Sequence, residues 1–97
     1  AIIESTAKID TGCQIMAGSI IGSNVSISKN CIINSGSIIS HNTEISSSTH
    51  ITPGATVAGH VKIGKRVTIG MCATIFLNLK ISDDIIINNN ESVFNDC

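Results

Sequence analysis

The sequence predicts an all-β fold, a parallel β-helix built from hexapeptide repeats, and three observations indicate it. Every sixth residue from Ile3 to Val93 is isoleucine or valine, at sixteen of sixteen positions and without an insertion. A fixed period of six is typical of a parallel β-helix and matches neither the α-helical period nor a heptad. Only two aromatic residues are present, and a narrow bore filled by β-branched side chains needs no more. We call these sixteen residues the ladder.

The repeat has a second inward position, four residues after each ladder residue. It holds mostly small or β-branched residues, and Cys13, Cys31 and Cys97 fall there. This position lies two residues before the next ladder residue, and residues two apart on a strand point to the same face. We therefore expect a large side chain to fill the bore and a small one to fit near each corner.

Three hexapeptides make one triangular coil, so the chain forms about five coils and a prism roughly 25 Å tall. Residues one coil apart then stack on one another, and the corners are rich in Gly, Asn, Asp and Ser, which tolerate turn conformations. We expect residues 1–97 to form this single domain. The first residue is Ala1 and not a methionine, which leaves a preceding segment open.

Taken in order, the coils differ in their outward residues. Residues 1–38 show no catalytic pattern, whereas residues 39–64 hold all three histidines and the only proline. From Ile81 onward the outward residues are mainly Ser, Asp and Asn. Glu91 falls in an inward position, where a charge is costly without a partner, so we expect the last coil to fray or to adopt a different cap.

Charge and composition argue against several classes of protein. Six basic and seven acidic residues, with no interleaved aromatic residues, do not predict a basic or base-stacking surface for nucleic acid. No apolar run approaches the roughly 20 residues that span a bilayer, and no signal peptide opens the chain. Four cysteines without a C-x-x-C motif indicate reduced thiols. We expect a cytoplasmic protein with no nucleic-acid or membrane partner.

The central segment carries a more specific pattern. The pattern runs through His41, His50, Thr52-Pro53-Gly54-Ala55, Ala58-Gly59 and Val61-Lys62-Ile63-Gly64, and continues at Ile69-Gly70 and Asn78-Leu79-Lys80-Ile81. This arrangement resembles the C-terminal domain of the hexapeptide-repeat acyltransferases that O-acetylate sialic acid or N-acetylate bacillosamine-type amino sugars. The resemblance covers most of the chain and implies a left-handed β-helix, although parallel crossovers are generally right-handed.

The resemblance implies an acetyl-CoA-dependent acetyltransferase that acts directly on a sugar or nucleotide sugar, at nitrogen or at oxygen. In the family the first histidine of this segment, His41 here, is the general base that deprotonates the acceptor. Unperturbed imidazole has a pKa of ~6.5, which suits a base at neutral pH. The next residue, Asn42 here, orients that histidine. The family forms homotrimers with active sites between subunits, and we expect the same arrangement here.

For the acyl donor, the resemblance implies that His50 lines the acetyl-CoA site and that the backbone N–H of Gly59 binds the thioester carbonyl oxygen. It places four more residues among the cofactor-binding set: Lys62, Gly64, Gly70 and Lys80. Lys62 also lies near Lys65 and Arg66. This basic cluster either contacts a phosphorylated cofactor or forms a solvated face.

Spacing supports the predicted site independently. Gly59 follows His41 by three hexapeptides and so lies one coil above it, where glycine leaves room for substrate and an exposed N–H can stabilise an oxyanion. His50 is half a coil from His41, so the two histidines point from different sides of one prism. They converge only if a neighbouring prism supplies one of them.

Two other functions are weighed against this one. The first is a non-catalytic, truncated β-helix that serves for trimerisation. Three departures from the family motivate it. Asn42 stands where the family has an acid, although Glu44 is an alternative orienting acid. Residues 88–93 replace the family's closing Gly-Ala-Gly-Ala-Val-Val, and the family's sugar-nucleotide domain is not represented. The second is a zinc-dependent carbonic anhydrase of the same fold, which needs two histidines two coils apart. The histidines here are spaced by nine and ten residues, so no metal site is predicted, and His60 is expected to be an exposed corner residue.

Overall fold

The computed structural model describes residues 1–97 and consists of sixteen two-residue strands, with no helix that could cross a membrane. The strands form three parallel sheets, which we call A, B and C. Sheet A contains β1 (Ile2–Ile3), β4 (Ile20–Ile21), β7 (Ile38–Ile39), β10 (Thr56–Val57), β13 (Thr74–Ile75) and β16 (Ser92–Val93). Sheet B contains β2 (Lys8–Ile9), β5 (Ser26–Ile27), β8 (Glu44–Ile45), β11 (Lys62–Ile63) and β14 (Lys80–Ile81). Sheet C contains β3 (Gln14–Ile15), β6 (Ile32–Ile33), β9 (His50–Ile51), β12 (Thr68–Ile69) and β15 (Ile86–Ile87).

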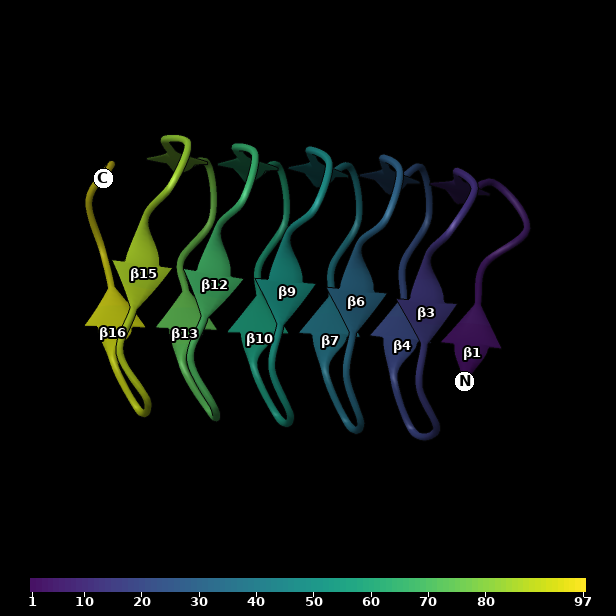
Figure 1. The fold of residues 1–97 in the computed structure, drawn as a ribbon, viewed down its shortest axis with the longest axis horizontal. Helices are drawn as coiled ribbons and strands as arrows, with labels where there is room; N and C mark the ends of the chain where they lie inside the picture. Colours follow the sequence, from purple (N-terminus) through teal and green to yellow (C-terminus); the bar gives the residue numbers. More distant parts are fainter.

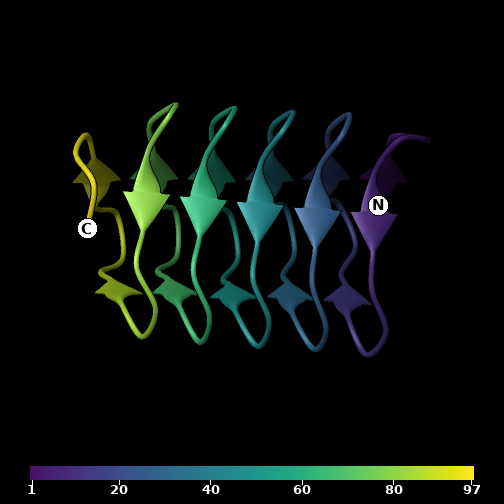
Figure 2. The same ribbon diagram turned by 90° about the horizontal axis from the view of Figure 1, so that it is seen from above.

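Consecutive strands lie on different sides of a triangular prism, and each strand pairs with the strand three places further along the chain (Figure 1). The coils follow one another evenly from the N-terminal to the C-terminal end when the prism is turned (Figure 2). Ile3 pairs with Ile21 and Ile63 with Ile81, in each case across three hexapeptides. The prism measures 30 × 21 × 20 Å. The predicted all-β fold and its coil of three hexapeptides are confirmed.

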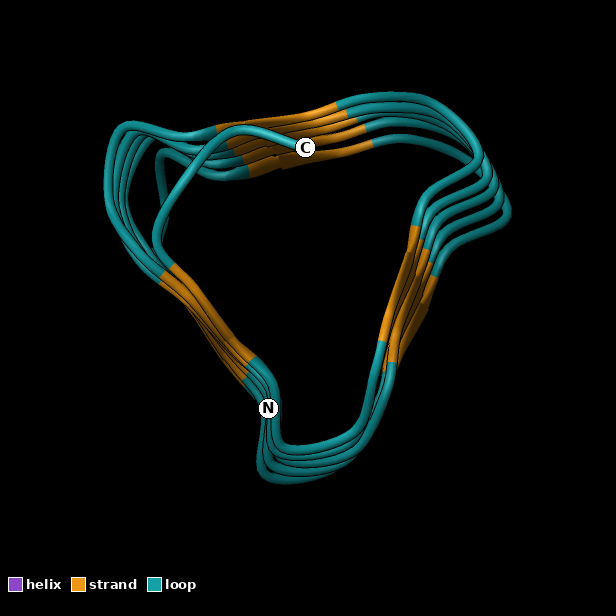
Figure 3. Ribbon diagram, turned by 90° about the vertical axis from the view of Figure 1, so that its left-hand side faces the viewer, coloured by secondary structure: helices purple, strands orange, loops and turns teal.

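The coils wind in the left-handed sense. Figure 3 views the prism from its C-terminal end, and the chain passes from sheet A to sheet B and then to sheet C clockwise as it comes toward the viewer. A right-handed coil would turn anticlockwise in this view. The left-handed β-helix is therefore confirmed, against the general preference of parallel crossovers.

The ladder side chains fill the bore of the prism. From Ile21 to Val93 every ladder residue is at most 5% exposed. Ile3, Ile9 and Ile15 are more exposed because they belong to the first coil, which has no coil beneath it. Each fully buried isoleucine contributes about 2–3 kcal/mol by leaving water, so the ladder is the main source of stability.

The second inward position is polar and buried at Ser19, Ser37, Thr43 and Thr49, and each of these side chains has a hydrogen-bond partner. Ser37 Oγ donates to the Thr52 carbonyl at 3.0 Å, and Thr49 Oγ1 donates to the Gly64 carbonyl at 2.8 Å. Small hydroxyl side chains thus cover corner carbonyls that the sheets leave unpaired, which removes the cost of burying them.

Fourteen corners contain a residue with positive φ, three places after the ladder residue. Four of these residues are glycine, and the other ten have φ between 54° and 62°. Half of the ten are asparagine, whose short polar side chain tolerates the left-handed conformation better than most residues do. The Gly- and Asn-rich corners of the sequence are thereby explained.

The C-terminal end is covered by the tail of the chain. β16 keeps its register with β13, so the last coil does not fray. Cys97 N donates to the Lys80 carbonyl at 3.0 Å and Ser82 N donates to the Cys97 carbonyl at 2.9 Å, which places the tail over the end of sheet B. Glu91 and Cys97 are exposed, so placing them inside was wrong: Glu91 keeps the repeat but no further coil covers it, and the chain leaves the repeat before Cys97. Glu91 Oε1 instead accepts from Asn88 N at 3.0 Å, and the alternative of a different cap is confirmed.

Candidate active site

His41 and Gly59 lie one above the other at the corner between sheets A and B. His41 follows β7, and Gly59 follows β10 in the next coil. A β-carbon built on Gly59 would lie 2.9 Å from His41 Nε2 and 3.0 Å from Cε1, distances that real β-carbons do not tolerate. The imidazole therefore packs directly against the Gly59 backbone, as the spacing of one full coil predicted.

The side chain that contacts the His41 imidazole at its other nitrogen is Asn42. His41 Nδ1 lies 3.1 Å from Asn42 Oδ1, and an amide oxygen can only accept a hydrogen bond. In the neutral tautomer that carries its proton on Nδ1, the two side chains form a hydrogen bond, and Nε2, the nitrogen beside Gly59, then carries the lone pair. Glu44, the alternative orienting acid, instead faces Lys62, with 3.9 Å between its Oε2 and Lys62 Nζ.

The backbone N–H of Gly59 has no hydrogen-bond acceptor within the chain, and Gly59 is buried, with the His41 ring packed against it. Buried Thr43 donates from Oγ1 to the Ala58 carbonyl at 2.9 Å, which directs that carbonyl inward. In a trans peptide the following N–H points the opposite way. At another corner the equivalent N–H, that of Lys65, is covered by Asp83 Oδ1 at 2.8 Å. The Gly59 N–H is thus left without an acceptor, and a ligand oxygen can bind it only where the His41 ring leaves room.

Three residues at this corner were missed by the sequence analysis as contributors to the site. A β-carbon on Gly22, one coil below, would lie 2.9 Å from the His41 backbone nitrogen, so only glycine fits there. Thr43 holds the Ala58 carbonyl, and His60 places its ring centroid 5.1 Å from that of His41, at 88°. The position of Gly22 one coil below Ser40 was a signal for its role; no comparable signal marked the other two.

His50 lies on the other side of the prism, on the outer face of sheet C. It is half-buried, and its neighbours across the sheet are Ile32 and Thr68. Its Nε2 lies 3.3 Å from Asn34 Nδ2, an amide donor that leaves the imidazole proton on Nδ1. In a triangular prism sheet C faces away from the corner of His41 (Figure 3), so one chain does not bring the two histidines together.

The remaining predicted cofactor-binding residues lie on sheet B or at the corners that flank sheet C. Lys62 and Lys80 are adjacent in register on the exposed face of sheet B. Gly64 and Gly70 have structural reasons to be glycine: a β-carbon would lie 2.6 Å from Asp83 N at Gly64, and 2.6 Å from the Ile87 carbonyl oxygen at Gly70. The next coil passes too close to both for any side chain.

The basic cluster near Lys62 is partly neutralised by the chain itself. Arg66 Nε lies 2.6 Å from Asp84 Oδ1, and Nη2 lies 3.1 Å from Oδ2. This bidentate bond lowers the pKa of the Asp84 carboxyl and raises the pKa of the Arg66 guanidinium. Both side chains are exposed. Arg66 therefore belongs to a solvated ion pair, which favours the simpler interpretation of this cluster.

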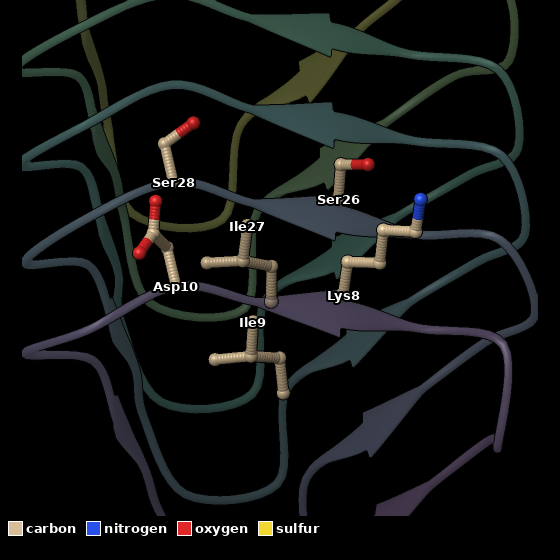
Figure 4. A pocket seen from close by; sticks show the side chains of 6 residues that line it. All are labelled: Lys8, Ile9, Asp10, Ser26, Ile27 and Ser28. Carbon is tan, nitrogen blue, oxygen red and sulfur yellow. The ribbon is translucent and has the colours of Figure 1, made fainter.

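The surface of the single chain has one hollow, of about 350 Å³ (Figure 4), and His41 is not among the residues that line it. It is lined by residues of β2 and β5 and their following turns: Lys8, Ile9, Asp10, Ser26, Ile27 and Ser28. No three His, Cys, Asp or Glu side chains gather as they would around a metal ion. The corner of His41 is open on the single chain, so a closed substrate cavity there needs a second surface.

A protein-family model matches the central part of the chain. Residues 42–76 match the family model described as bacterial transferase hexapeptide (six repeats), a segment that begins directly after His41 and includes Gly59. No curated protein matches the chain by sequence. By fold and by this match, the chain is a left-handed β-helix of hexapeptide repeats, and its central coils carry the repeat of that family.

Several solved structures have a fold similar to that of this chain. The acetyltransferase domain of PglB from Neisseria gonorrhoeae, in complex with acetyl coenzyme A, superposes with a TM-score of 0.91 at 20% identity, over 95% of this chain and 47% of that one. PerB from Caulobacter crescentus, with CoA and GDP-perosamine, gives a TM-score of 0.82 at 25% identity, over 97% and 48%. The UDP-N-acetylglucosamine acyltransferase of Francisella novicida gives 0.66 at 19%, over 91% and 46%. The chain thus spans about half the length of these proteins.

Proposed function

We propose that this protein is an acetyl-CoA-dependent acetyltransferase whose acceptor is a sugar or nucleotide sugar. The observation that supports the proposal is the contact of His41 Nε2 with Gly59: an imidazole nitrogen lies beside a backbone N–H that has no acceptor within the chain. Acyl transfer from a thioester needs these two groups next to each other, a base for the nucleophile and a donor for the oxyanion. The likeness to the PglB domain and to PerB, which bind acetyl-CoA or CoA, supports the choice of donor.

The chemistry assigns one task to each group. His41 Nε2 takes the proton from the acceptor amine or hydroxyl while that group attacks the thioester carbonyl carbon. The carbonyl oxygen becomes an oxyanion and accepts a hydrogen bond from Gly59 N–H. When the tetrahedral intermediate collapses, the C–S bond breaks and the imidazolium returns its proton to the CoA thiolate. Through its bond to Nδ1, Asn42 holds His41 in the tautomer that these reaction steps require.

The donor site is proposed to form between chains of a homotrimer. His41 and His50 lie on opposite sides of one prism, and the corner of His41 has no hollow of its own. In a three-fold arrangement the His50 face of one copy meets the His41 corner of the next. His50, Gly59, Lys62, Gly64, Gly70 and Lys80 are then the proposed contacts of acetyl-CoA, with the two lysines suited to its phosphates as exposed cations.

A non-catalytic trimerisation module is the second candidate, and the neutral partner of His41 favours it. Asn42 accepts a hydrogen bond but carries no charge to stabilise the imidazolium. This candidate predicts a trimer that does not bind acetyl-CoA. The acetyltransferase predicts a trimer that binds about one acetyl-CoA per chain.

The deciding experiment measures oligomeric state by light scattering and acetyl-CoA binding by calorimetry, and then transfer to amino-sugar and sugar-nucleotide acceptors. His41→Ala is expected to keep acetyl-CoA binding and to lower turnover by ~10²-fold or more. Ser26→Ala, on the face of β5, is the matched control and is expected to change neither. A trimer without acetyl-CoA binding, or full turnover in His41→Ala, would overturn the proposal.

A further inference from the structure

The His41 imidazole is held on three sides, and one of the three groups has no part in the proposed chemistry. Asn42 binds Nδ1, and the Gly59 backbone lies against Nε2. The third group is the ring of His60, edge to face with His41 at a centroid distance of 5.1 Å and an interplanar angle of 88°. Aromatic rings prefer this T-shaped arrangement at about 4.5–7 Å.

His60 reaches His41 because of its place in the coil. It stands one coil above Asn42, and its backbone N donates to the His41 carbonyl at 3.1 Å. Its φ of 58° belongs to the left-handed region, where five of the ten non-glycine corner residues are asparagine. The two rings meet edge to face although both histidines are exposed, and an asparagine at this corner has no ring to make that contact.

We propose that His60 is a positioning residue for His41, which acts through ring packing and not through contact with the substrate. The Asn42 bond fixes one nitrogen but leaves the imidazole free to swing about it. The His60 ring blocks that motion and keeps Nε2 beside Gly59, where the acceptor proton is received. The consequence for catalysis rests on the proposed function, since His41 is the base only in that reaction; the consequence for the conformation of His41 does not.

His60→Asn tests the proposal, because asparagine fits the φ of 58° at this corner and the fold is retained. We expect kcat to fall by about five-fold at unchanged KM for acetyl-CoA, the scale of one aromatic pair. The chain has only three histidines, so ¹⁵N imidazole NMR resolves each one. Wild type is expected to show a single Nδ1–H tautomer for His41, and His60→Asn a mixture of tautomers.

Two further variants make the outcome specific. His60→Phe keeps a ring without ionisable nitrogens; the φ of 58° costs it some stability, but in the folded protein it is expected to restore both kcat and the single tautomer. Ser48→Asn changes a corner residue with a φ of 61° that is remote from His41 and is expected to alter neither. Unchanged His41 signals in His60→Asn, or a raised KM at constant kcat, would overturn the proposal, and the tautomer signals decide it even if wild type transfers no acetyl group.

Discussion

The imidazole of His41 occupies the space that a side chain at Gly59 would need, with Nε2 2.9 Å from the position of the missing β-carbon. Gly59 has no positive φ, so the glycine is required by this contact and not by its backbone conformation. A methyl group there has to displace the ring or the coil.

Gly59→Ala is accordingly expected to lower the free energy of unfolding by about 1–3 kcal/mol, the usual cost of overpacking. It is also expected to reduce transfer by about ten-fold or more, since the base moves away from the oxyanion donor. Chemical denaturation and steady-state kinetics measure the two effects. In a His41→Ala background the stability loss should shrink; a loss of the same size in both backgrounds would show that the ring is not the obstacle.

Thr43→Val is expected to affect both stability and catalysis. The hydroxyl that holds the Ala58 carbonyl at 2.9 Å is lost, and a buried carbonyl without its donor costs about 1–3 kcal/mol. The Gly59 N–H then loses its fixed direction, so kcat should fall. Ser37→Ala removes an equivalent bond to the Thr52 carbonyl, at 3.0 Å, and serves as the control: similar destabilisation with kcat retained. Equal kcat values for both variants would contradict this prediction.

Asn42→Asp is expected to raise kcat by about five-fold, because a carboxylate stabilises the imidazolium formed during proton transfer and an amide does not. Aspartate tolerates the left-handed conformation, so the φ of 60° at this corner is no obstacle. Asn24→Asp makes the same change one coil below, at a φ of 58°, and should leave kcat unchanged. A slower Asn42→Asp enzyme would show that His41 does not carry positive charge in the rate-limiting step.

The Asp84–Arg66 pair gives a pH dependence of known sign. The guanidinium lowers the pKa of the Asp84 carboxyl below its usual 3.8, so the folded state favours the ionised form. The contribution is complete above pH 3.8 and is lost as the pH falls through the lower folded value. Urea unfolding should therefore separate wild type from Asp84→Asn at neutral pH, and the difference should shrink as the pH is lowered below 3.8. A difference that persists in acid would contradict the linkage.

Thiol reactivity should follow burial. Burial raises the pKa of the Cys31 thiol, which also donates to the Ser46 carbonyl at 3.1 Å, whereas Cys72 and Cys97 are exposed. An aromatic disulfide reagent at mildly alkaline pH is expected to modify the two exposed thiols rapidly and Cys31 only after unfolding. Equal rates for Cys31 and Cys72 in the folded protein would show that the bore opens readily.

The sequence was sufficient for the fold because one rule repeats along its whole length. The ladder predicts the register of every strand, and the same spacing predicts that Gly59 lies over His41. The six-residue period does not determine the handedness of the β-helix, and the left-handed prediction came from the resemblance to other proteins. The packing of His60 on His41, the bond from Thr43 to Ala58 and the tail over sheet B depend on side-chain rotamers and on a departure from the repeat, which a periodic pattern does not describe.

Because each coil contains three hexapeptides, the position of a side chain is given by its coil, here called a storey, and by the edge of the prism on which it lies. Insertion or removal of a whole storey below Gly22 would shift His41, Gly59 and His60 together and leave their neighbours unchanged. Insertion of a single hexapeptide between His41 and Gly59 would keep every isoleucine in the bore, yet it would carry Gly59 onto a different edge. An insertion of any whole number of hexapeptides therefore preserves the buried core and its stability. The alignment of the reacting groups is preserved only when whole storeys are inserted.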